Sequence, residues 1–137
     1  MVSRQTMSNW MLRNTDDWLT PVYDELYRML LQYDLLHADE TKLQVLHEKG
    51  KDAQDLNYMW LYRTGSNAEH PIVLYEYAPR RGQEYPAAFL NGFRGYLQTD
   101  GCAGYNAVEG AIHVGCWAPV RRKFDEALRA VQRENAR

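Results

Sequence analysis

The chain has 137 residues, of which 45% are hydrophobic and 25% are charged, so it can form one ordinary soluble domain with a buried core. Its formal net charge of -2 and its pI near 6.1 exclude a globally basic nucleic-acid-binding domain, so any contact with DNA must be local. No stretch approaches the roughly 18 apolar residues that span a bilayer, and residues 1–6 lack a signal core. We therefore expect a cytoplasmic protein that has no membrane partner.

The first 34 residues are predicted to form an N-terminal helical segment. Residues 3–18 have a helical composition, with Trp10 and Trp18 as large apolar anchors. A second helix is predicted from Pro21, a residue suited to the first helical turn. Its apolar residues recur at helical spacing: Val22, Tyr23, Leu26, Leu30 and Tyr33.

Residues 35–137 alternate between strand-like and helical runs. The predicted strands are 35–46, 58–64, 72–77, 95–99 and 111–117, and the predicted helices are 85–93 and a basic helix that begins at Pro119. Short loops between the first three strands favour an antiparallel meander, and the helix before the fourth allows that strand to run parallel to a meander strand. The expected fold class is α/β, a ribonuclease H-like mixed five-stranded sheet flanked by helices.

Two aspartates interrupt or end strand-like runs, where an uncompensated carboxylate would be costly. Asp39 lies in the first predicted strand, and Asp100 directly follows the fourth. At a separation of ~4 Å two carboxylates repel by about 1 kcal/mol in water and about 4 kcal/mol at an effective dielectric of 20, so such a pair favours a cation between them. If the fold brings the two together, they bind a metal ion. The competing interpretation is local, because Asp100 and Gly101 also form a common turn dipeptide.

The neighbours of these aspartates are weaker candidates. Successive strand residues alternate between faces, so Glu40 should point away from the metal and His37 should share the face of Asp39. For His37 we favour a solvated or hydrogen-bonded side chain over a ligand. His113 and Cys116 have an incomplete zinc spacing and alternate faces, so we expect Cys116 to be a buried thiol.

A basic triplet begins the last predicted helix. Arg121, Arg122 and Lys123 form either a solvated face or a site for DNA phosphates. Phe124 and Leu128 have the spacing of a buried stripe on the same helix.

Several ordered motifs cover residues 35–124. They are His37 to Thr41, Leu61 to Gly65, Gly95 to Gly101, Gly104 to Tyr105, and Gly115 to Ala118 with Arg121 to Phe124. In this order they resemble insertion-sequence transposases of family sixty-six. The helix before Asp39 and the segment Phe89 to Phe93 also fit that family, so the resemblance covers nearly the whole chain.

The resemblance implies a ribonuclease H-like core in which two Asp and one Glu hold Mg²⁺ or Mn²⁺ for DNA strand cleavage and strand transfer. Asp39 and Asp100 match the first two acids and are the expected catalytic and metal-binding residues. The implied partners are transposon ends and target DNA, with self-association into a homo-oligomer. Pro119 departs from the pattern, because the family commonly has a histidine there.

The third acid of such transposases is expected beyond the basic helix, whereas this chain ends at Arg137. We therefore interpret residues 35–137 as a catalytic core truncated before its third acidic residue, with little or no activity alone. Asp125 and Glu126 are weak substitutes for the missing glutamate.

The competing function is a non-catalytic DNA-binding or transposase-assembly module that acts through the Arg121 to Lys123 helix. A small-molecule enzyme is disfavoured, because the sequence has no glycine-rich phosphate loop or nucleophile elbow.

Overall fold

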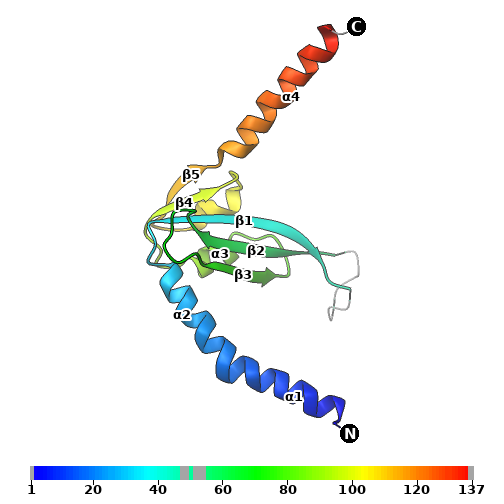
Figure 1. The fold of residues 1–137 in the computed structure, drawn as a ribbon, viewed down its shortest axis with the longest axis vertical. Helices are drawn as coiled ribbons and strands as arrows, with labels where there is room; N and C mark the ends of the chain where they lie inside the picture. Colours follow the sequence, from blue (N-terminus) through cyan, green and yellow to red (C-terminus); the bar gives the residue numbers. More distant parts are fainter. Residues whose placement is uncertain (1, 47–49, 51–54, 136–137) are drawn as a thin grey trace.

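The computed structural model describes residues 2–46, 50 and 55–135, and it consists of a five-stranded sheet with helices packed on it and projecting from it (Figure 1). In chain order the elements are α1 (Arg4–Asn14), the π-helical η1 (Thr15–Leu19), α2 (Thr20–Leu30), β1 (Leu35–Gln44), β2 (Leu56–Thr64), β3 (Val73–Ala78), α3 (Glu84–Phe89), β4 (Tyr96–Thr99), the 3₁₀ turn η2 (Ala103–Ala107), β5 (Ile112–Gly115) and α4 (Trp117–Asn135). None of the helices in these ranges is both long and apolar enough to cross a membrane.

The strand order is β3-β2-β1-β4-β5. The first three strands form the predicted antiparallel meander, and β4 runs parallel to both β1 and β5. The long connection through α3 makes this possible, because a parallel neighbour needs a crossover rather than a hairpin. The predicted α/β class and mixed five-stranded sheet are confirmed, and the arrangement is consistent with a ribonuclease H-like fold.

The core lies between the sheet and the short helix α3. Tyr62 of β2 stacks on Phe89 of α3 with ring centroids 3.9 Å apart, and Leu36 and Leu97 are fully buried on the adjoining strands. Burying a side chain of this size stabilises a fold by about 1.5–3 kcal/mol. Tyr27 fastens α2 to this layer, because its hydroxyl donates a 2.6 Å hydrogen bond to the Phe89 carbonyl.

A close backbone approach sets where β4 starts beside β1. The Tyr96 amide donates a 2.7 Å hydrogen bond to the Asp34 carbonyl, just before β1 begins. A Cβ on Gly95 would lie 2.6 Å from that same carbonyl oxygen, so only glycine fits there without a shift of backbone. This contact fixes the register of the two strands that carry the candidate site.

The terminal helices extend away from the sheet in Figure 1, and two expectations about their packing were wrong. Phe124 and Leu128 of α4 are 71% and 62% exposed instead of buried. Trp10 and Trp18 are also exposed, so they do not anchor the first helical segment within the described residues. Helical periodicity identifies an apolar face, but it does not require the same chain to cover that face.

Several predicted boundaries also shift. The fifth strand ends at Gly115, and Trp117 already belongs to α4, where Pro119 occupies the first turn. A proline is tolerated there because the first amides of a helix have no intrahelical acceptor.

Candidate functional site

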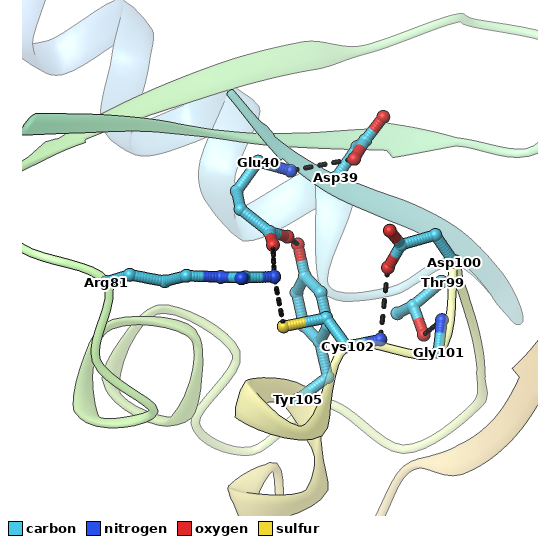
Figure 2. A network of polar contacts seen from close by, with 8 residues as sticks. All are labelled: Asp39, Glu40, Arg81, Thr99, Asp100, Gly101, Cys102 and Tyr105. Atoms are coloured by element: carbon cyan, nitrogen blue, oxygen red, sulfur yellow. Dashed lines mark hydrogen bonds and ion pairs between the residues drawn. The ribbon is translucent and has the colours of Figure 1, made fainter. Parts of the chain in front are cut away.

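The register of β1 and β4 brings Asp39 and Asp100 to one place. The parallel pairing runs from Leu35 opposite Tyr96 to His37 opposite Gln98, and the two aspartates lie two residues further along each strand. Both aspartates line a pocket of about 200 Å³, together with His37, Arg63 and Cys116 among other residues. Figure 2 shows Asp39 on β1 and Asp100 at the end of β4. Both side chains are exposed, so solvent ions can reach them.

Backbone amides hold one oxygen of each carboxylate. The Glu40 amide donates to Asp39 Oδ1 at 2.9 Å, and the Cys102 amide donates to Asp100 Oδ1 at 3.0 Å (Figure 2). The second contact closes a turn after β4, in which Gly101 has a φ of 94°, a conformation that favours glycine. The turn interpretation of Asp100 and Gly101 is therefore correct as local structure, and it leaves Asp100 at the pocket.

His37 and Arg63 line one side of this pocket, and Arg63 makes that side cationic. The two residues lie opposite each other in the β1 and β2 pairing, and both line the pocket. Burial lowers the pKa of His37 below its usual value, and the nearby Arg63 charge lowers it further. The imidazole is therefore neutral at pH 7, and Arg63 carries the positive charge on this side.

Glu40 points to the opposite side of β1, as strand alternation predicts. Its side chain is only 5% exposed and forms an ion pair with Arg81, from the connection between β3 and α3. The Tyr105 hydroxyl donates a 2.9 Å hydrogen bond to the other Glu40 oxygen (Figure 2). Burial and the Glu40 carboxylate both raise the pKa of Tyr105, so its hydroxyl keeps its proton and donates. Sequence reasoning missed this cluster, because no local pattern links these three residues.

The remaining sulfur and histidine candidates do not form a zinc site. His113 is exposed on β5, whereas Cys116 lines the aspartate pocket. Cys116 is half-buried, so the expectation of a buried thiol was wrong. Its backbone amide donates to the Thr99 carbonyl, which places its side chain at the edge of the pocket. Within the described ranges, no group of three or more His, Cys, Asp or Glu residues could hold a metal ion.

The basic triplet lies near the start of α4 and is exposed. Successive helix residues differ by about 100° around the axis, so Arg121, Arg122 and Lys123 cannot all face one surface. Arg122 instead shares a face with Arg129 and Arg133, which follow it by 7 and 11 positions. Arg121 lies 3.8 Å from the exposed carboxylate of Asp125, and neither Asp125 nor Glu126 lines the aspartate pocket.

Comparison with known proteins gives relatives that are themselves uncharacterised. The chain is 31% identical over 137 residues to the protein y4qI of Sinorhizobium fredii, and the match covers 90% of this chain and 25% of that protein. It is 30% identical over 120 residues to y4hP of the same organism, with 79% of this chain and 21% of that protein covered. The chain thus spans about a quarter of the length of these relatives. No solved structure matches it. The model of the Transposase IS66 family matches residues 1–137, and the chain belongs to this family.

Proposed function

We propose that this chain contributes part of the catalytic core of a DNA transposase, in which Asp39 and Asp100 hold Mg²⁺ or Mn²⁺ for strand cleavage and strand transfer. Residues 35–137 would form the ribonuclease H-like core, and residues 1–34 the helical segment that precedes it. The observation that carries the proposal is the parallel register of β1 and β4, which places both carboxylates at one pocket. Transposon ends and target DNA are the proposed substrates.

The donor set at this pocket suits a hard divalent cation. Mg²⁺ prefers carboxylate oxygens and keeps several waters, and both aspartates are exposed enough to share a hydrated ion. One oxygen of each carboxylate accepts a hydrogen bond from a backbone amide. This hydrogen bond orients the other oxygen without neutralising the charge of the carboxylate. When bound, divalent cations would activate the attacking oxygen and stabilise the leaving oxygen of a phosphodiester.

The chain's own residues would bind and orient the DNA. Asp39 and Asp100 act as ligands and not as nucleophiles, because a metal-bound carboxylate serves to position the ion. Arg63, at the same pocket, supplies a fixed positive charge for a backbone phosphate. His37 is neutral at pH 7 and can donate or accept one hydrogen bond there.

Two carboxylates alone hold Mg²⁺ weakly. Since the described residues contain no group of three potential ligands, we expect the isolated chain to bind metal weakly and to cleave DNA slowly or not at all.

Direct metal binding tests this proposal better than activity does. Mn²⁺ should broaden the amide signals around Asp39 and Asp100 in a saturable way, and Asp39→Asn or Asp100→Asn should abolish this effect. Asp24→Asn removes an exposed carboxylate on α2 and serves as the matched control. Equal broadening in the wild type and in both Asn variants would refute the assignment.

A second function is favoured by a different observation, the exposed basic face of α4. In this alternative the chain is a non-catalytic module that binds DNA or assembles with further transposase copies. Arg122, Arg129 and Arg133 provide the phosphate contacts of one face, and Arg121 and Lys123 lie on the two neighbouring sides of the helix. DNA binding that falls with salt but ignores Asp39→Asn and Asp100→Asn would support this function over the catalytic one. Sedimentation with and without DNA would detect a homo-oligomer.

A further inference from the structure

The backbone pairing of β1 and β4 stops before the two aspartates. The last paired residues are His37 and Gln98, whereas Asp39 and Asp100 lie two positions beyond them. The segment after β4 turns away at Gly101, so ladder hydrogen bonds cannot hold it against β1. The β1–β4 ladder therefore brings the two aspartates near each other but does not by itself fix the distance between their carboxylates.

The cluster around the buried carboxylate of Glu40 joins these same two segments from below the sheet. Arg81 contacts both Glu40 Oε1 on β1 and Cys102 Sγ in the turn after β4 (Figure 2). The Tyr105 hydroxyl, on η2, holds the second Glu40 oxygen at 2.9 Å. Glu40 is therefore linked to the chain after β4 in two ways, through Arg81 to Cys102 and directly to Tyr105 of η2.

Together these contacts form a continuous path from Asp39 to Asp100. The Glu40 amide holds Asp39 Oδ1, and the Cys102 amide holds Asp100 Oδ1. Arg81 completes the path between Glu40 and Cys102. A shift of Arg81 or Tyr105 would thus be passed to the backbone amides that orient both carboxylates.

We propose that Glu40, held by Arg81 and Tyr105, is a positioning residue that sets the separation of Asp39 and Asp100. A buried carboxylate is costly unless it is paired and hydrogen-bonded, so Glu40 tolerates little movement of its two partners. The metal part of this inference rests on the proposed function. The positioning of the two segments does not require metal.

The test compares metal-free protein with variants that alter one contact each. Tyr105→Phe removes a single oxygen, and Arg81→Gln removes the cation of a side chain that is 49% exposed, so both variants are expected to fold. Arg80→Gln is the matched control, because Arg80 pairs with Glu84 on α3 and not with Glu40. Arg81→Lys keeps the charge and should restore part of what Arg81→Gln loses.

The primary measurement is the set of backbone NOEs between residues 39–40 and 100–102, together with exchange of the Cys102 amide. We expect both cluster variants to lose the NOEs and to exchange this amide faster, while Arg80→Gln matches the wild type. Mn²⁺ affinity is the second measurement, and it should fall at least about tenfold in Tyr105→Phe and Arg81→Gln, as for residues that orient metal ligands.

The two measurements separate the positioning inference from the proposed function. Lost NOEs in the variants, with no Mn²⁺ binding even by the wild type, would support positioning and refute the metal site. NOEs that persist in both folded cluster variants, or that are absent from the wild type, would overturn the positioning inference whatever the Mn²⁺ affinity.

Discussion

Replacing Asp39 by Asn should stabilise the metal-free protein. Adjacent strands are about 4.8 Å apart, so two carboxylates at one pocket of neighbouring strands lie on the order of 5–7 Å apart. Coulomb's law gives a repulsion of about 0.6–0.8 kcal/mol in water and about 2–3 kcal/mol at an effective dielectric of 20. Both side chains are exposed, so the lower range applies. Asn keeps the oxygen that accepts the Glu40 amide, so we expect a gain of about 0.7 kcal/mol in the free energy of unfolding.

Urea unfolding, followed by tryptophan fluorescence at neutral pH, measures this gain. In ~1 M salt the Debye length is about 3 Å, so the difference between Asp39→Asn and the wild type should vanish. Mg²⁺ at ten times its dissociation constant should stabilise the wild type by about 1.4 kcal/mol and leave Asp39→Asn unchanged. Asp24→Asn, the control, should respond to Mg²⁺ as the wild type does. A variant less stable than the wild type at low salt, or one that gains equally from Mg²⁺, would refute the reasoning.

Three further predictions concern DNA binding and pH. Replacing both Arg122 and Arg129 by Gln should lower the magnitude of the slope of log DNA affinity against log salt concentration by about 1.8, if both residues contact phosphates. Lys123→Gln, on another side of α4, should change this slope less. Equal slopes for the double variant and Lys123→Gln in filter-binding titrations would contradict the shared face. The pKa of His37 is lowered in the folded state, so the unfolded chain binds more protons below about pH 6.5 and stability should rise with pH up to that point. His37→Gln should flatten this rise in denaturation curves between pH 5 and 7. Burial raises the pKa of Glu76, so at pH values just above the usual glutamate pKa the folded state binds more protons than the unfolded chain, and stability should fall as the pH rises. Glu76→Gln should remove this fall. An unchanged pH profile in the variant would count against the prediction.

The antiparallel meander and the parallel direction of β4 were predictable, because local patterns and chain connectivity determine them together, but the position of β4 beside β1 did not follow from these patterns. Short loops between β1, β2 and β3 favour antiparallel neighbours, and the helix before β4 permits a parallel one. Alternation along β1 also predicted that Asp39 and Glu40 lie on opposite faces, as the ion pair of Glu40 with Arg81 now confirms. These inferences need only the period of a strand and the length of a connection.

The cluster beneath the sheet was not predictable in the same way. Arg81 lies 41 residues from Glu40, and Tyr105 lies 65 residues from it, in a connection and a 3₁₀ turn that carry no periodic pattern. The exposure of the apolar face of α4 could not be predicted from the sequence for a related reason. Phe124 and Leu128 have the spacing of a buried stripe, and that spacing is the same when no described element covers it.

The adjacent acids of β1 show how one strand serves two opposite electrostatic needs. Asp39 lies at a solvent-exposed pocket, where its charge stays available for a cation, and Glu40 is buried, where its charge must be cancelled by Arg81 and hydrogen-bonded by Tyr105. Because Asp39 and Glu40 are consecutive residues joined by one peptide bond, the contacts that hold Glu40 also limit the movement of Asp39. An apolar residue at position 40 could be buried without the desolvation cost of a carboxylate. It would lack, however, the directional contacts that join β1 to the turn carrying Asp100. The desolvation cost of the buried Glu40 carboxylate is therefore offset by a more precise position of the exposed Asp39 carboxylate.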